Sequence, residues 1–277
     1  ERLAGYLRMA AAMGVPVVSF LTHGAYFSHP RWAATSRKGK IQVHYGILFS
    51  EEQIKSYSVE EIYEKMCEAL HTNEYHWQEK MMIPYEGKRL AEYLERLLFL
   101  CPKCGKTGTL YSKGDTLTCL SCGETVRYNI FGYFEKEKGR PLFRTVLEWN
   151  KWQLKRLEEI IRERLSNPGK PIFEDRDVTL FTGQKFLSLK KLRKGILRLY
   201  TDRLEFLGRD NTKTVFSLAH LNGVSTHLSD WFDFYHEGKF HRAAFRDRHT
   251  SANKYTEAFD IIKRLEHGRL RPREESL

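Results

Sequence analysis

Residues 101–122 read CPKCGKTGTLYSKGDTLTCLSC and contain two Cys-x-x-Cys pairs separated by fourteen residues. Each pair, Cys101/Cys104 and Cys119/Cys122, places two thiolates on one tight turn, and the residues between the pairs are typical of a β-hairpin. The hairpin would bring the second pair over the first, so that four sulfurs surround one Zn²⁺ tetrahedrally. A glycine follows each pair and suits a close approach of the backbone at a metal turn. The pattern therefore predicts one structural zinc ion in a small ribbon, with no coordination position left open for catalysis.

The same four cysteines could instead form two disulfides or a redox pair. Disulfides require an oxidising compartment, and the sequence shows no signal peptide. The longest apolar run, Val15–Leu21, is far shorter than the roughly 20 residues that a membrane-spanning helix needs. We therefore favour zinc. Cys67 stands outside the pattern and is expected to pack as a small apolar side chain.

A chain of 277 residues with 41% hydrophobic residues is expected to form two or three domains with buried cores. Its net charge of +11 is uneven: residues 1–99 carry 12 basic and 12 acidic side chains, residues 100–176 carry 15 and 10, and residues 177–277 carry 19 and 13. A basic surface can bind nucleic acid, anionic lipid or neither. The hairpin between the cysteine pairs lacks the interleaved aromatic and basic residues of a single-strand binder, so we do not expect nucleic acid as the partner.

The first 99 residues alternate helical and extended patterns. Residues 1–13 are rich in Ala, Leu and Met and predict the end of a helix, and the run GVPVVSFLTHG that follows predicts a buried strand. KIQVHY, at residues 40–45, alternates polar and apolar residues as a second strand does. The sequence SVEE from Ser58 is a capping-box pattern that predicts a helix to about residue 71. A further helix is expected over residues 88–99, leading directly into the first cysteine pair.

This order resembles the C-terminal half of the lysophosphatidic acid (glycerolipid) acyltransferase superfamily. The resemblance rests on the Val-Pro-Val block of Val15–Phe20, the Pro-x-Trp loop of Pro30–Trp32 and the Gly-Lys-Ile-x-Val strand of Gly39–Gly46, and it covers about residues 1–72. It implies a partial α/β domain in which Val15–Phe20 and Gly39–Gly46 are both strands. It also implies a membrane-associated enzyme that transfers an acyl chain from a thioester donor to the free hydroxyl of a lysophospholipid, with lysophosphatidic acid as the expected acceptor.

The catalytic motifs of that superfamily are missing from this chain. The family uses a His and an Asp five positions apart, in which the His is the general base, and a Phe-Pro-Glu-Gly-Thr-type block that binds glycerol phosphate. None of the eleven histidines is followed by an Asp five positions later, and Glu-Gly-Thr does not occur. A general base must lie within hydrogen-bond reach of its proton. We therefore assign no catalytic residue and expect the chain to be an inactive piece of a longer enzyme.

Two histidines near the predicted strand admit two interpretations. His23 stands at the end of the strand and could line the acyl-acceptor site, with His29 a few residues further on. The alternative is that these are loop histidines bonded to the backbone. No second catalytic partner lies near them in the sequence, so we favour the alternative.

After the ribbon, Thr125–Tyr128 is expected to add a strand to it, and a helix is expected from Leu142 to Leu165 with Pro141 in its first turn. Apolar residues fall at helical spacing along this helix. Its two tryptophans and its basic side chains would also suit a helix that lies at a membrane interface. Four glutamates dilute the positive face, so we favour packing between domains. SNPGKP, at residues 166–171, is the clearest linker.

From Asp177 the pattern changes to short strands separated by turns. The eight candidate strands are DVTLF, KFLSL, GILRLY, RLEFLG, KTVFSL, GVSTHL, WFDFY and KFHRAAF. Ser251 can cap a final helix, residues 252–266, whose apolar face contains Tyr255, Phe259, Ile262 and Leu265. An antiparallel barrel of about seven strands closed by one C-terminal helix resembles the pleckstrin-homology (PH) and GRAM domains, over about residues 175–267.

Domains of that kind often bind phosphoinositides or other anionic lipids through a basic loop. The segment KKLRKG stands where the resemblance places such a loop, and its basic residues are Lys190, Lys191, Arg193 and Lys194. Clustered basic residues near a membrane surface contribute about 1 kcal/mol each. The alternative is a solvated turn in a basic protein, and the sequence does not choose between the two.

Together these patterns predict a multidomain α+β chain. Its expected parts are the acyltransferase remnant (1–99), the four-cysteine zinc ribbon (100–134), a connecting helix and linker (135–170), the PH/GRAM-like barrel (171–267) and a tail (268–277). We expect part of a cytoplasmic acyltransferase that is peripheral to the membrane, with the membrane surface or anionic lipid, an acyl thioester and a lysophospholipid as partners. The alternative is a non-catalytic adaptor in which the ribbon and the PH-like domain bind lipid or protein.

Overall fold

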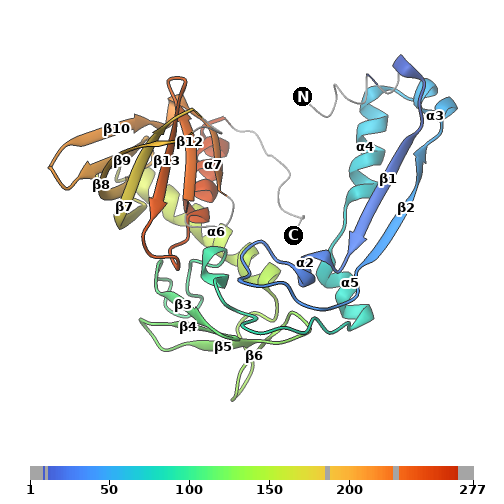
Figure 1. The fold of residues 1–277 in the computed structure, drawn as a ribbon, viewed down its shortest axis with the longest axis horizontal. Coiled ribbons are helices and arrows are strands. Elements are labelled where there is room, and N and C mark those ends of the chain that lie inside the picture. The colour runs from blue at the N-terminus through green and yellow to red at the C-terminus, as the bar shows by residue number, and fades with distance from the viewer. Residues whose placement is uncertain (1–8, 10–11, 185–187, 227–230, 268–277) are drawn as a thin grey trace. The chain divides into compact units, whose positions relative to one another are not determined.

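The computed structural model describes residues 9, 12–184, 188–226 and 231–267 (Figure 1). The chain divides into two compact units, one built from residues 1–30 and 37–86 and the other from residues 31–36 and 87–271. Most of the predicted N-terminal helix, the tail, and parts of the predicted strands KFLSL and GVSTHL lie outside the described residues. Within the described part of the chain, every helix is too short or too polar to cross a bilayer.

The first unit is a two-stranded antiparallel sheet with helices against one face. Its elements are β1 (Val17–His23), α2 (Ala25–Ser28), β2 (Gln42–Phe49), α3 (Glu51–Ser56), α4 (Val59–Leu70) and α5 (Glu74–Met81). Ser58 and Glu61 form the predicted capping box at the start of α4. The core joins Phe49 to Ile54 of α3 and to Ile62 and Met66 of α4.

The opposite face of this sheet is apolar and open. Val18 pairs with Ile47 and Phe20 pairs with Tyr45 across the two strands, and these four side chains are 60%, 69%, 66% and 80% exposed. The prediction of a buried strand was therefore wrong for one face of β1. Helices pack against one face of the sheet, and the β-branched residues that suggested full burial alternate between the two faces.

The second unit begins with the ribbon, a four-stranded antiparallel sheet in the order β3-β4-β5-β6. The strands are β3 (Leu110–Lys113), β4 (Thr116–Cys119), β5 (Thr125–Tyr128) and β6 (Phe134–Glu135), so the predicted hairpin and its added third strand are confirmed. The predicted helix over residues 88–99 was wrong. Only a short 3₁₀ turn, η1 (Leu94–Arg96), forms there, because Tyr93 has a positive φ and the Leu90 N–H donates to the Asp115 carboxylate.

The helix that follows the ribbon is α6 (Val146–Leu165). It begins four residues later than predicted because Thr145 and Glu148 form a capping box. Trp149 and Leu157 are buried, and the Trp149 indole N–H donates to the Leu100 carbonyl at 2.9 Å. These contacts confirm that α6 packs within the protein, which we favoured over a position at a membrane interface.

The rest of the second unit is a curled antiparallel sheet of seven strands that forms a half-barrel, with one helix against it (Figure 1). The elements are β7 (Phe173–Gly183), β8 (Lys190–Leu199), β9 (Arg203–Gly208), β10 (Lys213–Ser217), η2 (Leu218–His220), β11 (Leu221–Thr226), β12 (Trp231–His236), β13 (Lys239–Phe245) and α7 (Asn253–His267). Their order is β10-β9-β8-β7-β13-β12-β11. Tyr255 and Ile262 of α7 lie in the core with the inner faces of the strands, as predicted.

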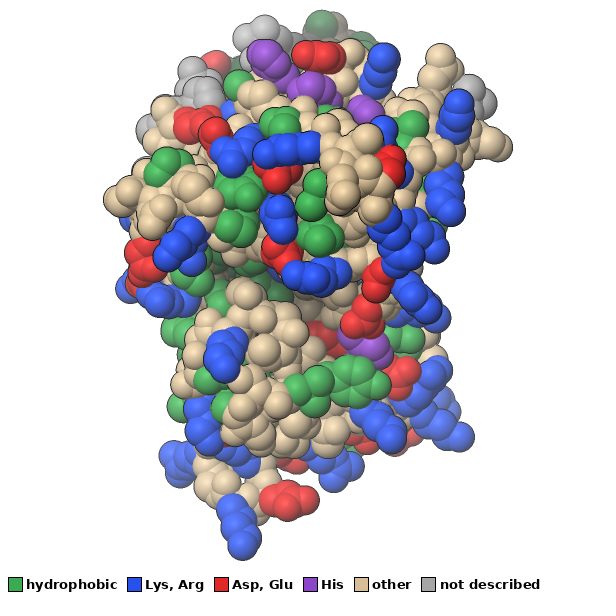
Figure 2. Space-filling view, turned by 90° about the vertical axis from the view of Figure 1, so that its left-hand side faces the viewer, with side chains coloured by type: hydrophobic (Ala, Val, Ile, Leu, Met, Phe, Trp, Pro, Cys, Tyr) green, Lys and Arg blue, Asp and Glu red, His purple; other side chains and the backbone are tan. Residues whose placement is uncertain are grey.

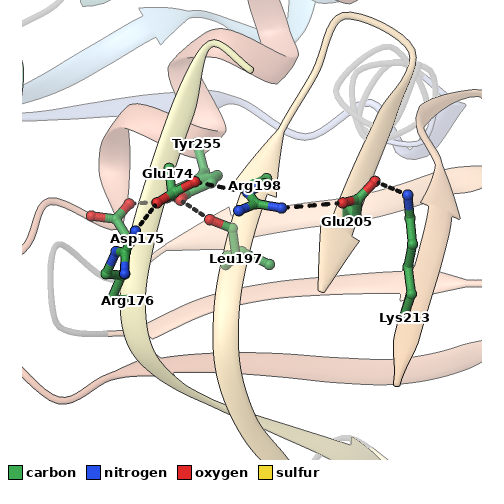
Figure 3. Close-up of polar contacts among 8 residues, drawn as sticks. All are labelled: Glu174, Asp175, Arg176, Leu197, Arg198, Glu205, Lys213 and Tyr255. Atoms are coloured by element: carbon green, nitrogen blue, oxygen red, sulfur yellow. Dashed lines mark hydrogen bonds and ion pairs between the residues drawn. The ribbon is translucent and has the colours of Figure 1, made fainter. Parts of the chain in front are cut away.

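Polar contacts tie α7 to the sheet and cross the sheet itself (Figure 3). The buried Tyr255 hydroxyl donates to Asp175 of β7 at 2.6 Å, and burial raises the pKa of Tyr255 well above its ordinary value. A row of ion pairs runs from Glu174 through Arg198 and Glu205 to Lys213, one residue from each of β7 to β10. Burial alone would raise the pKa of Glu205, but its cationic neighbours outweigh burial and lower it.

Candidate metal centre

The β3-β4 hairpin brings the four cysteine sulfurs of the ribbon together. Cys101 Sγ lies 3.7 Å from Cys122 Sγ, Cys104 Sγ lies 3.7 Å from Cys119 Sγ, and all four sulfurs lie within 4.8 Å of one another. Four sulfurs at 2.3 Å from a tetrahedral Zn²⁺ would be about 3.8 Å apart, whereas a disulfide would need about 2.05 Å. The four thiols are free in the structure, and their arrangement can hold one metal ion.

The two cysteine turns have the same backbone geometry. The Gly105 N–H donates to the Cys101 carbonyl and the Gly123 N–H donates to the Cys119 carbonyl, both at 2.9 Å. Gly105 has φ 68° and Gly123 has φ 71°. A Cβ at either position would meet open space, so the left-handed backbone is what favours glycine there, rather than the close approach expected from the sequence.

The thiols differ in their electrostatic surroundings. Burial raises the pKa of the Cys101 thiol to about 12. Burial also acts to raise the pKa of Cys119, but the Thr109 hydroxyl and backbone N–H groups of its own turn lower it to about 6. A bound divalent cation would favour the thiolate at every one of the four positions.

Basic side chains surround the cysteine turns. Glu124, which follows the second turn, pairs with Lys136 at 2.5 Å and with Lys103 of the first turn at 3.5 Å. The Lys136 bond is the main cause that lowers the pKa of Glu124. Lys106 donates to Ser121 across the two turns at 2.8 Å. Four thiolates and a divalent ion carry a net negative charge, and Lys103 and Lys106 lie where they can offset it.

The fifth cysteine is separate from this cluster. Cys67 lies on α4 and is exposed, so the expectation that it packs as an apolar side chain was wrong. Position 67 falls on the solvent side of the helix, whereas Ile62 and Met66 face the core. With four protein thiolates and no fifth ligand grouped with them among the described residues, the centre is closed in the way that structural metal sites are.

The predicted basic loop is not a loop. Lys190, Lys191, Arg193 and Lys194 all lie in β8, where they pair with residues of β7. Successive residues of a strand point to opposite faces, so Arg193 and Lys194 cannot act as one surface. The β7-β8 turn comes earlier in the chain than the sequence suggested, because β7 extends to Gly183 and β8 begins at Lys190. Figure 2 shows basic and acidic side chains interspersed over the face that it draws.

His23 has a carboxylate partner, not the backbone partner that we favoured. Its Nδ1 lies 3.0 Å from Glu74 Oε1, and Glu74 Oε2 accepts from the Gly24 N–H at 2.6 Å. The imidazole stacks on Trp77, with the ring centroids 5.4 Å apart. Glu74 and Trp77 belong to α5, a helix that the sequence analysis did not predict, so the pairing had no visible sequence signal. His29 follows α2, and its backbone N–H donates to the Ala25 carbonyl.

No protein-family model matches the chain, and no curated protein matches it.

Proposed function

We propose that this chain is part of a membrane-associated acyltransferase of the cytoplasmic side. The whole enzyme would transfer an acyl chain from a thioester donor to a lysophospholipid, with lysophosphatidic acid as the acceptor. The ribbon would hold one structural Zn²⁺ at Cys101, Cys104, Cys119 and Cys122, and the half-barrel would be a PH-like accessory domain. The 277 residues of this chain would supply the non-catalytic part.

The observation that carries the proposal is the pairing of the two stretches that resemble the acyltransferase superfamily. Val15–Phe20 and Gly39–Gly46 are separate in the sequence, yet they meet as β1 and β2, with Phe20 opposite Tyr45 and Ser19 opposite Gly46. Two strands from one sheet are what the resemblance implies. The open apolar face of Val18, Phe20, Tyr45 and Ile47 is consistent with a sheet that further parts of an enzyme would cover.

The chain lacks the general base that this chemistry needs. No histidine in the sequence precedes an Asp at the required spacing. His23, the histidine at the end of β1, is held by Glu74 and Trp77, and none of these residues belongs to the family's catalytic motif. A general base must reach the acceptor hydroxyl directly or through one water, so we place catalysis in other residues of the whole enzyme.

Acyl transfer by the full reading frame that contains this chain tests the proposal. We expect transfer from acyl-coenzyme A to lysophosphatidic acid in detergent micelles, and no transfer by the 277-residue chain alone. An inactive full reading frame would contradict the enzyme assignment. Activity of the isolated chain would contradict the location of catalysis outside it.

A second candidate function is lipid binding by the half-barrel without catalysis. It is favoured by Lys191 and Lys194, which are exposed, have no ion pair among the described residues and pair with Phe181 and Thr179 on one face of the sheet. Substituting Lys190, Lys191, Arg193 and Lys194 together by Gln is expected to weaken binding to anionic vesicles by about tenfold or more, since each charge near a membrane contributes about 1 kcal/mol. Sedimentation with phosphatidylserine vesicles measures this, and Lys151→Gln on α6 is a matched control. Unchanged binding would remove β8 from any lipid site.

A further inference from the structure

Two histidines and a glutamate meet at the end of the half-barrel where β12 turns into β13. The residues are His220 at the end of η2, His236 at the end of β12 and Glu237 in the turn. One ligand atom from each lies within 4.8 Å of the other two. The rings of His220 and His236 have centroids 6.2 Å apart, and His236 Nδ1 lies 4.0 Å from Glu237 Oε2.

The sheet pairs His236 directly and holds the residues next to His220 and Glu237. His236 pairs with Lys239 across a two-residue turn in which Glu237 and Gly238 both have positive φ, the pattern of a type I′ hairpin. On the other side, His236 pairs with Leu221, the residue directly after His220. The Phe216 ring packs edge-on against the His236 ring at 5.3 Å and limits its rotation. The cluster is therefore a product of strand register and not of a flexible loop.

Two imidazoles and one carboxylate form a donor set for a divalent transition ion. Neutral imidazole suits Zn²⁺, Cu²⁺ and Ni²⁺, and a carboxylate supplies the charge that favours a dication. Ligand atoms around a tetrahedral zinc would lie about 3.4 Å apart, so the side chains must close slightly on the ion. His220 and Glu237 are exposed, which leaves both side chains free to do so.

One neighbouring charge opposes a cation at this place. Lys239 lies opposite His236 on the adjacent strand. No ion pair holds the Lys239 ammonium among the described residues, and its long stem lets it turn towards solvent. Its effect should therefore weaken the affinity without abolishing binding.

We propose that His220, His236 and Glu237 form a second metal site, which binds a divalent first-row transition ion with water in the remaining position. The site is independent of the proposed acyltransferase function and of the four cysteines. Three protein ligands leave coordination open, unlike the closed cysteine centre.

The test is a zinc titration of the full chain after its cysteine centre has been loaded with one equivalent. Isothermal calorimetry in a non-chelating buffer at neutral pH is expected to show one further equivalent of Zn²⁺. His236→Ala and Glu237→Gln are each expected to weaken it more than about tenfold, because even residues that only orient a ligand change metal affinity by about 10- to 100-fold. Lys239→Gln is expected to tighten it.

His76→Ala, which removes an exposed histidine of α5, is the matched control and should leave the titration unchanged. His220→Ala guards against misfolding, because the side chain is exposed and its loss should not disturb the sheet. A loaded chain that binds no further zinc when the metal is in large excess over the protein would overturn the proposal. So would a second equivalent that survives both His220→Ala and His236→Ala with unchanged affinity.

Discussion

Replacing Cys119 by Ser is expected to abolish zinc binding at the cysteine centre and to unfold the ribbon. Cys119 is fully buried, and its sulfur lies against both Cys104 Sγ and the Thr109 hydroxyl. Structural zinc contributes about 10–16 kcal/mol of apparent folding free energy in small zinc domains. The ribbon's strands are at most four residues long, so its sheet cannot replace a contribution of that size.

The expected loss is at least about 5 kcal/mol, which is comparable to the whole stability of many domains. Thermal unfolding followed by circular dichroism, together with metal content by plasma mass spectrometry, measures it on reduced protein. Cys67→Ser is the matched control, because Cys67 is exposed and lies on α4. A Cys119→Ser protein with an unchanged Tm would show that this centre does not hold the ribbon together.

The ribbon could be predicted from the sequence because its constraint is local. The spacing of the two cysteine pairs defines the hairpin, and the residues that form β3 and β4 run between the two pairs and end at Cys119. The final helix was predictable for a similar reason, since an apolar face at helical spacing places Tyr255 and Ile262 on the same side. In both cases the determining residues are close in the chain.

Three of the failures depend on contacts with other parts of the chain. Residues 88–99 have a helical pattern, but the Tyr93 N–H donates to the Ser112 hydroxyl and the Ala91 N–H donates to the Gly114 carbonyl, so the hairpin turn replaces the helix. KKLRKG looks like a turn, yet its backbone pairs with β7. His23 finds its partner 51 residues away in Glu74. Propensity is a weak prior when tertiary contacts of this kind compete with it.

The acyltransferase resemblance differs in kind from these local predictions. It depends on the order of short motifs. The two motifs that form strands pair with each other in the structure, and neither supplies a catalytic group. The cysteine centre is the best-defined site of the chain, yet a closed set of four thiolates has no position for a substrate. The site that is clearest in the sequence therefore does not identify the reaction, which must be tested by activity.

A buried side chain of α6, Gln153, helps to hold the segment that leads into the first cysteine turn. Its Oε1 accepts from the Phe99 N–H at 2.9 Å, and its Nε2 donates to the Leu97 carbonyl at 2.8 Å and to Asn150 Oδ1 at 2.7 Å. Gln153 has no exposed surface. Gln153→Ala removes these bonds and leaves buried backbone groups without partners, at about 1–3 kcal/mol each. We expect a loss of about 4 kcal/mol, or roughly 10 °C in Tm for a unit of this size.

Gln153→Met separates the hydrogen bonds from the cavity, because methionine keeps most of the volume and none of the polar partners. If the polar contacts dominate, Gln153→Met should lose nearly as much stability as Gln153→Ala, whereas a cavity effect would be largely restored. Lys151→Ala, exposed on the same helix, is expected to stay within about 0.5 kcal/mol of the parent. Urea unfolding of zinc-loaded protein gives all three values. A Gln153→Ala protein as stable as Lys151→Ala would mean that the Gln153 hydrogen bonds do not anchor the ribbon.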